Sequence, residues 1–445
     1  MSKRIVVLGG AESGTGAAVL AKLQGFDVFL SDMSNIAPAF VNTLNDYGIA
    51  FEQGQHTADL ICNATEIIKS PGIPTKAPII QQIIALQIPI ISEIEFASRY
   101  TNAKMIAITG TNGKTTTTLL TYHLLKNAGL NVGLAGNVGN SFAMQVATKK
   151  FDYYVLELSS FMLDDMFDFK ADIAILTNIT PDHLDRYDYQ MQKYVNSKFR
   201  ITQNQTASDY FIYCKDDEVI QAALASQQID STMIPFSIAE DLAYGASISN
   251  QHLNIKLKQN TFTMTIQELA LQGKHNLYNS MASGVAAKLL DIRNETLKES
   301  MSDFKNAPHR LEHVARIQGI EFINDSKATN VNATWFALES INTPIIWIAG
   351  GVDKGNDYSM LTQLVKDRVR AIVCLGTDNS KIHEAFGNVV DIIVNTASAT
   401  EAAEVSYHLG KKGDTVLLSP ACASFDLFKN YEDRGQQFID AVKEL

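Results

Sequence analysis

The chain has 445 residues, of which 46% are hydrophobic and 19% charged, as is ordinary for a soluble globular protein. This length exceeds what one ordinary core accommodates and predicts about three domains. The formal net charge of −11 and the pI near 5.3 argue against nucleic acid and against an anionic membrane surface as partners. Basic residues that bind an anionic substrate must therefore be placed locally.

The cysteines and the N-terminus predict a cytoplasmic protein without membrane insertion. The four cysteines are far apart and form no CxxC pair, which favours a reducing compartment. After Met-Ser-Lys-Arg only four apolar residues precede Gly9 and Gly10, so this segment resembles a first β-strand and not a signal peptide. No apolar run approaches the roughly 18 residues that a membrane helix needs.

The first block of the chain, residues 1–92, predicts a parallel sheet. Residues 4–8 form a short apolar run, followed by a glycine-rich turn, a helical pattern and a second apolar run at 27–32. This order is typical of a β-α-β unit. The strand expected at 88–92 closes the block, which places a domain boundary near Ser92.

Two further α/β domains are expected, at residues 93–306 and 307–445. The second opens with a strand at 105–110, a glycine turn and a helix from about Thr115. Its stretch 205–275 is rich in Gln, Ser and Thr and predicts antiparallel strands with connecting loops. The third domain has apolar strands in IEFIND, PIIWIAGG, AIVCLG, DIIVN and TVLLSP. Active sites of such chains usually lie at the carboxyl ends of strands.

The segment Gly110-Thr111-Asn112-Gly113-Lys114-Thr115 is the strongest chemical signal, because it lies between a predicted strand and a predicted helix. Glycines allow peptide N–H groups to surround phosphate oxygens, and the helix N-terminus adds its positive end. Lys114 would neutralise the terminal phosphates and the Thr115 hydroxyl would bind Mg²⁺. The alternative is a glycine-rich turn that only caps the helix.

Several polar residues follow the next strands. Glu157 ends one strand, Asp182 and His183 follow another, and Lys198 lies on the helix after it. Taken singly, they could be a solvated carboxylate, an ordinary histidine and a surface lysine. Beside a phosphate loop they indicate more, because Mg²⁺-ATP needs oxygen ligands nearby.

In the third block, the polar run 324–330 follows a strand. Asp325 there could bind a ribose hydroxyl and Lys327 could stabilise an oxyanion. The alternative is a helix N-cap, and both roles can hold at once. Arg310 stands near the domain junction and could reach ATP phosphates. At the N-terminus, the turn 9–14 with Asp32 approximates a dinucleotide fingerprint, but Ala11 replaces its second glycine, so any nucleotide diphosphate or none would suit it.

Taken in order, these segments resemble the Mur ligase family of peptidoglycan synthesis. The resemblance rests on six motifs: TGTNGKT (109–115), ELSSF (157–161), TPDHLDR (180–186), GKHN (273–276), PHRLE (308–312) and NDSKATN (324–330). It implies a Rossmann-like UDP-binding domain, a P-loop ATP-binding central domain and a Rossmann-like C-terminal domain. The run 419–435 is most similar to that of the member that adds D-glutamate.

The resemblance implies a role for each matching residue. The UDP-linked substrate would contact seven residues: Ser13, Gly14, Asp32, Gly72, Asn137, Ser159 and His183. ATP would contact the loop and three later residues: Gly110, Thr111, Asn112, Gly113, Lys114, Thr115, Thr116, Asn276, Arg310 and Asp325. Magnesium would be held by Thr115, Glu157, His183 and a carbamylated Lys198. D-Glutamate would meet Lys327, Thr329, Lys354, Ser424 and Tyr431. The catalytic residues would be Lys114, His183, Lys198 and Lys327.

The implied activity is that of an ATP- and Mg²⁺-dependent ligase that acts as a monomer in the cytoplasm. It would activate the carboxylate of UDP-N-acetylmuramoyl-L-alanine as an acyl phosphate and join it to D-glutamate. The alternatives are a related ligase such as a folylpolyglutamate synthase, an NAD-dependent dehydrogenase and a non-catalytic nucleotide-binding module. Cofactor absorbance would identify the dehydrogenase, and ATP hydrolysis with candidate amino acids would separate the others.

Overall fold

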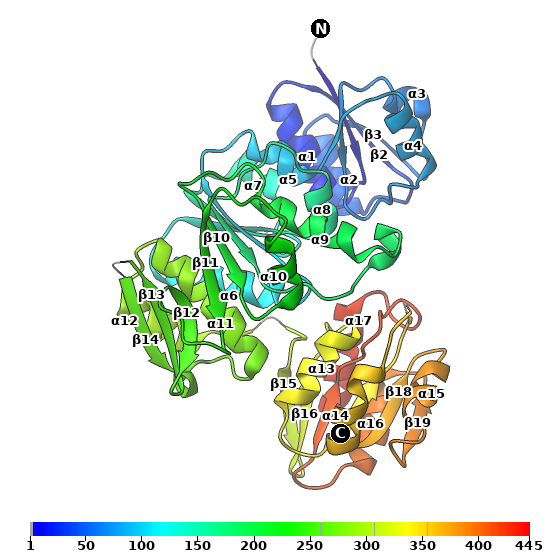
Figure 1. Ribbon diagram of the computed structural model, residues 1–445. Coiled ribbons are helices and arrows are strands. Elements are labelled where there is room, and N and C mark those ends of the chain that lie inside the picture. The colour runs from blue at the N-terminus through cyan, green and yellow to red at the C-terminus, as the bar shows by residue number, and fades with distance from the viewer. Residues whose placement is uncertain (1–2, 259, 307, 354) are drawn as a thin grey trace. The chain divides into compact units, whose positions relative to one another are not determined.

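The computed structural model of the protein describes residues 3–258, 260–306, 308–353 and 355–445. Its strands form three sheets in succession along the chain, which confirms three α/β domains (Figure 1). The chain divides into two compact units. The first unit extends to Leu271 and includes Asn276–Phe304, and the second comprises Gln272–His275 and Lys305–Leu445. The predicted domain boundaries near residues 92 and 306 lie between the sheets and stay predictions.

The N-terminal sheet is parallel throughout and has the order β3-β2-β1-β4-β5. Its strands are β1 (Arg4–Leu8), β2 (Asp27–Asp32), β3 (Ala50–Gln53), β4 (Glu66–Lys69) and β5 (Ile90–Ile91). The helices are α1 (Glu12–Leu23), α2 (Pro38–Asp46), α3 (Ala58–Ile61), α4 (Pro78–Ala85) and α5 (Glu93–Ser98). The strand order reverses between β1 and β4, where a crevice for a ligand is expected.

The central sheet has nine strands in the order β14-β13-β12-β11-β10-β9-β6-β8-β7. They are β6 (Lys104–Thr109), β7 (Val132–Gly136), β8 (Tyr153–Glu157), β9 (Ile173–Leu176), β10 (Tyr210–Cys214), β11 (Thr232–Ser237), β12 (Gly245–Ser249), β13 (His252–Leu257) and β14 (Asn260–Thr265). The α-helices are α6 (Lys114–Asn127), α7 (Phe142–Thr148), α8 (Ser160–Asp164), α9 (Met191–Phe199), α10 (Glu218–Leu224), α11 (Lys274–Leu289) and α12 (Asn294–Asp303). Short 3₁₀ turns are η1 (Leu184–Tyr187), η2 (Arg200–Thr202) and η3 (Ile266–Glu268).

The prediction of antiparallel strands over 205–275 is wrong for the first half of that stretch. Strands β10, β11 and β12 pair parallel, and only β12, β13 and β14 form an antiparallel meander. The reason is α10, a short helix between β10 and β11, because a crossover helix lets successive strands run in the same direction.

The C-terminal sheet has the order β15-β16-β20-β17-β18-β19. Its strands are β15 (Glu312–Ile317), β16 (Ile320–Asn324), β17 (Ile345–Ala349), β18 (Val369–Leu375), β19 (Ile393–Thr396) and β20 (Thr415–Leu418). The helical segments are α13 (Val331–Ser340), η4 (Ser359–Leu361), α14 (Thr362–Arg368), α15 (Ser380–Phe386), α16 (Ala399–Leu409) and α17 (Tyr431–Lys443). Strand β15, which the sequence analysis did not predict, pairs antiparallel with β16 at the sheet edge. The alternation of apolar and polar residues in β15 is weak because most of its residues are only half-buried.

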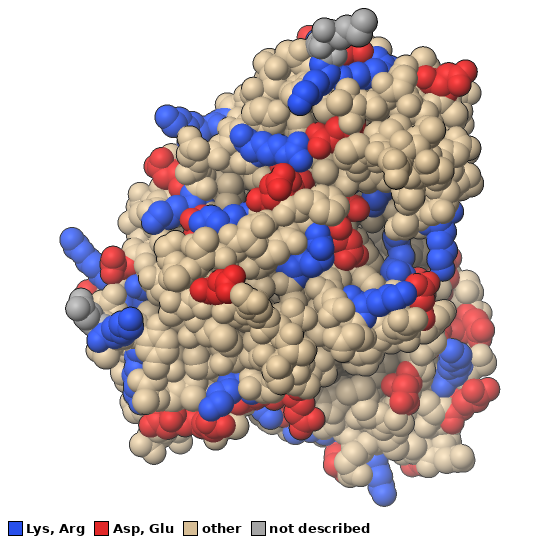
Figure 2. Space-filling model, turned by 45° about the horizontal axis from the view of Figure 1, so that its top comes forward, with Lys and Arg blue, Asp and Glu red and all other residues tan. Residues whose placement is uncertain are grey.

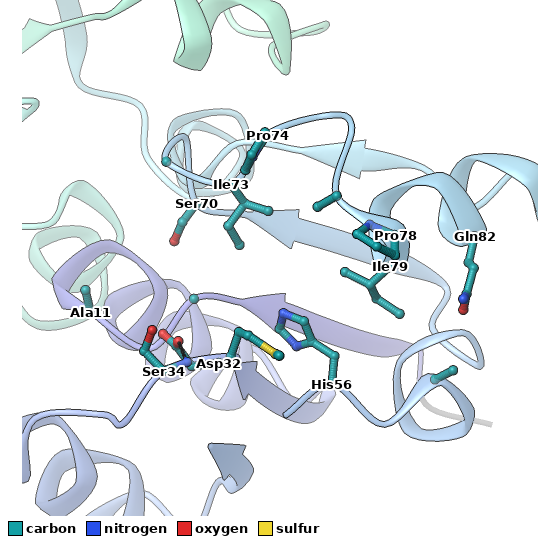
Figure 3. Close-up of a pocket in the computed structure, with 15 residues that line it drawn as sticks. Ala11, Asp32, Ser34, His56, Ser70, Ile73, Pro74, Pro78, Ile79 and Gln82 are labelled. Atoms are coloured by element: carbon teal, nitrogen blue, oxygen red, sulfur yellow. Dashed lines mark hydrogen bonds between the residues drawn. The ribbon is translucent and has the colours of Figure 1, made fainter. Parts of the chain in front are cut away.

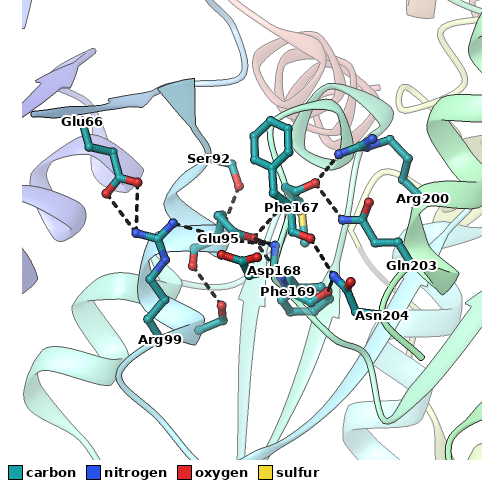
Figure 4. A network of polar contacts seen from close by, with 12 residues as sticks. Glu66, Ser92, Glu95, Arg99, Phe167, Asp168, Phe169, Arg200, Gln203 and Asn204 are labelled. Atoms are coloured by element: carbon teal, nitrogen blue, oxygen red, sulfur yellow. Dashed lines mark hydrogen bonds and ion pairs between the residues drawn. The ribbon is translucent and has the colours of Figure 1, made fainter. Parts of the chain in front are cut away.

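The segment between α8 and β9 is held from two sides within the first unit (Figure 4). On one side, the fully buried Glu95 of α5 accepts hydrogen bonds of 2.9–3.2 Å from the peptide N–H groups of Phe167, Asp168 and Phe169. On the other side, peptide oxygens of the segment accept hydrogen bonds from the side chains of Arg200, Gln203 and Asn204. These contacts join α5 to the end of α9, the helix that carries Lys198.

Surface charge is mixed on the face shown in Figure 2, where lysine and arginine side chains lie among aspartate and glutamate. No helix formed by the described residues combines the length and apolar character that a membrane span requires.

Candidate active site

The segment 110–115 forms a tight turn after β6 and the first residues of α6, as predicted. Gly113 precedes the helix with a backbone φ of +80°, a conformation that residues other than glycine rarely adopt. A Cβ at Gly113 would also lie 2.4 Å from Asn279 Oδ1, and one at Gly110 would lie 1.9 Å from Thr177 Oγ1. The loop therefore needs glycine at both positions.

The loop is held in this shape by the segment that follows β9. The Thr111 hydroxyl donates to the Thr180 peptide oxygen at 3.0 Å, and the Asn112 N–H donates to Asn178 Oδ1 at 2.8 Å. The Thr177 hydroxyl donates to the Asn112 peptide oxygen at 2.7 Å. Because this loop is already ordered at a helix N-terminus, phosphate could bind to it without a further loss of conformational entropy in the loop.

Lys114 and Lys198 share one acceptor. Both side-chain amines donate to the peptide oxygen of Gly110, at 2.9 Å and 2.7 Å, and Lys114 also donates to the Thr111 peptide oxygen. Lys198 is 1% exposed. Burial, together with the nearby charge of Lys114, lowers the pKa of Lys198 well below its usual value. The structure thus brings two predicted catalytic residues together, one of them in a site that favours a neutral amine.

Glu157 lies at the end of β8 and is 1% exposed. Its Oε1 accepts a hydrogen bond of 2.9 Å from the Asn137 side chain, while its Oε2 is buried and has no hydrogen-bond partner among the described residues. Those residues include no cluster of three or more His, Cys, Asp or Glu that could hold a metal. A divalent ion here would need further ligands from hydroxyl groups, water and phosphate, which suits Mg²⁺.

The remaining residues predicted to contact the substrate or metal near β8 and β9 lie on loops. His183 has a φ of +52°, a side chain 40% exposed, and a ring 5.3 Å from the ring of Phe161. The Ser159 hydroxyl caps α8 by accepting a hydrogen bond from the Met162 N–H at 3.3 Å. Its proton remains available to a ligand, so the cap does not exclude a binding role.

A cavity of about 620 Å³ opens at the carboxyl edge of the N-terminal sheet (Figure 3). Asp32 and Gly72 line it, together with His56, Ser70 and apolar residues, and none of its described lining residues is lysine or arginine. The Asp32 carboxylate accepts hydrogen bonds from the N–H groups of Gly10 and Ser34, at 2.5 Å and 2.7 Å. The lining suits a neutral polar ring better than a highly charged group.

Two predicted UDP contacts lie on α1, behind the turn. Gly14 packs so closely that an added Cβ would be 1.8 Å from the Gly9 peptide oxygen. Ser13 is half-buried on the same helix. Gly14 therefore has a clear packing role, and the contact of both residues with substrate stays a prediction.

In the second unit, Asp325 is buried at the end of β16. Its carboxyl accepts hydrogen bonds from the Ser419 hydroxyl at 3.0 Å and from the Leu311 N–H at 3.2 Å. Burial raises the pKa of Asp325 to about 7, although the charge of Arg310 opposes the shift. The Nε of Arg310 is buried and has no hydrogen-bond partner among the described residues. The structure thus brings together these two predicted ATP contacts.

The raised pKa of Asp325 predicts a pH-dependent stability. The folded unit retains a proton that the unfolded chain loses near pH 4, so folding stability falls as pH rises from about 4 to about 7. We expect Asp325→Asn to raise the melting temperature at pH 8, by about 2–4 °C for each kcal/mol gained in the free energy of unfolding. At pH 5 the increase in melting temperature should be smaller. Thermal unfolding monitored by circular dichroism at both pH values tests this. An equal shift at both values would show that Asp325 is already ionised beside Arg310.

The described residues predicted to contact D-glutamate lie on loops of the second unit and, for Tyr431, at the start of α17. The Lys327 amine lies 5.2 Å from the centre of the Tyr431 ring. The Thr329 N–H donates to the Lys327 peptide oxygen, and Ser424 is buried on the loop after β20. Lys354 lies outside the described residues. Among the described members of this set, Lys327 thus contacts Tyr431 through its side chain and Thr329 through its backbone.

Two residues near the site were not singled out from the sequence. Arg434 is 1% exposed and donates to the Ser326 hydroxyl and to the peptide oxygens of Ser326 and Cys422, which ties together the loops after β16 and β20. Tyr194 lies one turn before Lys198 on α9, with its hydroxyl 3.2 Å from the Thr111 hydroxyl and its ring 4.5 Å from the Lys198 amine. Tyr194 and Lys198 are four residues apart, so they lie on the same face of a helix, and this spacing could have indicated Tyr194 from the sequence.

Family models match most of the chain. They are the Mur ligase MurD-like, N-terminal domain at residues 3–92, the Mur ligase middle domain at residues 108–287, and the Mur ligase, glutamate ligase domain at residues 309–422. Together they span residues from all three sheets and the loop that precedes α6.

Comparison of the full-length chain with other proteins points to the same family. The UDP-N-acetylmuramoylalanine--D-glutamate ligase of Bacteroides fragilis is 55% identical over 444 residues, and that of Cytophaga hutchinsonii is 52% identical over 448 residues, each alignment covering 100% of both chains. Among solved structures, the UDP-N-acetylmuramate-alanine ligase MurC of Thermotoga maritima aligns over 100% of both chains with a TM-score of 0.62 at 19% identity. The MurF ligase of the same organism, in complex with ADP, aligns over 94% of both chains with a TM-score of 0.63 at 14% identity. These two structures show that the fold is shared.

Proposed function

Because the chain belongs to the Mur ligase family, we propose that it is an ATP-dependent ligase that joins D-glutamate to UDP-N-acetylmuramoyl-L-alanine in peptidoglycan precursor synthesis. The observation that carries this proposal is the full-length identity of 52–55% to relatives named as ligases of this specificity. It acts in the cytoplasm as a monomer and requires Mg²⁺.

The N-terminal cavity accommodates the uridine end of the substrate. Its volume of about 620 Å³ lies within the range of small-molecule sites, and its described lining carries no lysine or arginine. A neutral base and a ribose therefore fit it better than a diphosphate does. Asp32 stabilises the turn at the edge of the cavity by accepting hydrogen bonds from two peptide N–H groups. Gly72 also lines the cavity and has no side chain that would reduce its volume.

ATP binds with its phosphates on the loop 110–115. The peptide N–H groups at the start of α6 and the charge of Lys114 meet the terminal phosphates. The carboxylate of the muramoyl-alanine substrate attacks the γ-phosphorus, the bond to the β-phosphate oxygen breaks, and ADP leaves. Transfer of this kind depends on positioning and on charge neutralisation, which the loop and Lys114 supply.

The resulting acyl phosphate is attacked at its carbonyl carbon by the amine of D-glutamate. The tetrahedral intermediate collapses with loss of inorganic phosphate, and the amine gives up a proton as the amide forms. Lys327 and Tyr431, which contact each other, together with Thr329 and Ser424, hold D-glutamate. A cationic side chain complements a substrate that carries two carboxylates.

A divalent cation fits beside the loop because the buried Glu157 Oε2 has no protein partner among the described residues. When bound, Mg²⁺ supplies positive charge to the phosphate oxygens. Glu157, the Thr115 hydroxyl, His183 and Lys198 are the residues that would hold it. Lys198 would contribute as a carbamate, because the nitrogen of a neutral buried amine can form a bond to the carbon of CO₂ and release a proton to water, which leaves a carboxylate with two oxygen atoms and a negative charge.

The amino-acid specificity can be tested by phosphate release. With UDP-N-acetylmuramoyl-L-alanine and ATP, we expect D-glutamate to release phosphate at least about 10²-fold faster than L-glutamate, L-lysine or diaminopimelate, because a site built for particular polar groups rejects ligands that leave them unpaired. Mass spectrometry of the product checks for the amide. Preference for another amino acid, or glutamate addition to a folate without the UDP substrate, would assign the chain to a different ligase reaction.

A further inference from the structure

The loop that follows β7 approaches the end of β8 unusually closely. Parallel pairing of the two strands places Gly136 opposite Glu157. Gly136 has a φ of +98°, and a Cβ there would lie 2.3 Å from the peptide oxygen of Glu157. Only glycine permits this approach, and it brings the next residue, Asn137, against Glu157.

Asn137 makes two hydrogen bonds to Glu157. Its peptide N–H donates to the Glu157 peptide oxygen at 2.9 Å, and its side-chain Nδ2 donates to Glu157 Oε1, also at 2.9 Å. Both the backbone and the carboxylate of Glu157 are therefore held by one neighbour. Asn137 itself is exposed, whereas Glu157 is 1% exposed.

The second carboxylate oxygen of Glu157 is the informative atom. Oε2 is buried and has no hydrogen-bond partner among the described residues. A buried acceptor without a partner costs about 1–3 kcal/mol, so such atoms in folded proteins usually bind a water molecule or an ion or have a catalytic role. Because Oε1 is bound by Asn137, the carboxylate cannot rotate freely, and Oε2 is the oxygen left for a ligand.

We propose that Asn137 is a positioning residue that binds Glu157 Oε1 and thereby directs Oε2 at the divalent cation beside the phosphate loop. This inference rests on the proposed function, which makes Glu157 a ligand of that cation. Neighbours that orient metal-binding carboxylates in this way typically change metal affinity or activity by 10–100-fold when they are replaced. The role differs from the substrate contact that the family resemblance implies for Asn137.

The experiment measures Mn²⁺ binding in place of Mg²⁺, by electron paramagnetic resonance of free Mn²⁺, with a non-hydrolysable ATP analogue present. We expect Asn137→Leu, which keeps the branching at Cγ but loses the donor, to raise the Kd for Mn²⁺ about tenfold and to lower kcat similarly. The KM for the UDP-linked substrate should stay within about twofold of the wild-type value, since the effect acts through the metal site. Asn137→Gln, which retains an amide donor, should recover part of the affinity.

The matched control is Asn140→Leu, an exposed asparagine three residues further along the same loop, which should leave the Kd for Mn²⁺ unchanged. Glu157→Gln serves as the reference, and it should weaken Mn²⁺ binding at least as much as Asn137→Leu. If Glu157→Gln weakens binding but Asn137→Leu only raises the KM for the UDP-linked substrate, Asn137 is a substrate contact and the inference is wrong. If Glu157→Gln binds Mn²⁺ as tightly as the wild type, the proposed metal ligand is itself wrong.

Discussion

Replacement of Lys198 by alanine is expected to lower kcat by about 10²-fold or more, because the variant loses a group proposed to hold the cation beside ATP. Acetate should restore part of the activity, since a small carboxylate can occupy the space left by the side chain and supply oxygen ligands. Activity is measured as phosphate release with both substrates and ATP. The buried amine with its lowered pKa is the structural reason for expecting a carbamate at this position.

Carbamylation itself can be observed independently of turnover. The wild-type protein equilibrated with ¹³C-bicarbonate should show a ¹³C carbamate resonance that is absent from Lys198→Ala. Lys193→Ala is a matched control, because Lys193 lies on the same helix but is half exposed and paired with Asp188 at 2.8 Å. Full activity of Lys198→Ala would leave Lys198 as a buried lysine that only packs against Tyr194 and binds Gly110.

Replacement of Lys114 by alanine is expected to lower kcat by about 10²–10³-fold, because its charge offsets the charge that develops on the transferred phosphoryl group. Binding of the UDP-linked substrate should change little, since the N-terminal cavity lies on a different sheet from the phosphate loop. Single-turnover measurements with saturating ATP separate the chemical step from nucleotide binding.

Two controls make the Lys114 result decisive. Lys126→Ala changes an exposed lysine in the last turn of the same helix and should leave kcat unaffected. The melting temperature of Lys114→Ala should match that of the wild type, because the loop is also held by Thr111, Asn112 and Thr177. A correctly folded Lys114→Ala variant with nearly normal kcat would show that the loop 110–115 does not bind the transferred phosphate.

Local sequence was sufficient to predict the turn between β6 and α6, because glycines between an apolar strand and a helix mark such a turn. The side chains that crowd Gly110 and Gly113, those of Thr177 and Asn279, come from distant parts of the chain and were visible only in the tertiary structure. The alternation of apolar strands with helices likewise predicted three α/β domains. It did not reveal that β10 and β11 pair in parallel, because strand direction depends on the short helix α10 between them.

The chemical state of the site was decided only by tertiary structure. Lys198 is an ordinary lysine in the sequence, and its pKa falls because folding buries its amine and places it with Lys114 on the Gly110 peptide oxygen, which is 88 residues away along the chain. Asn137 meets Glu157 because β7 and β8 pair side by side. Motifs report local backbone and residue type, whereas burial, shared acceptors and unpaired carboxylate oxygens depend on which distant elements pack together.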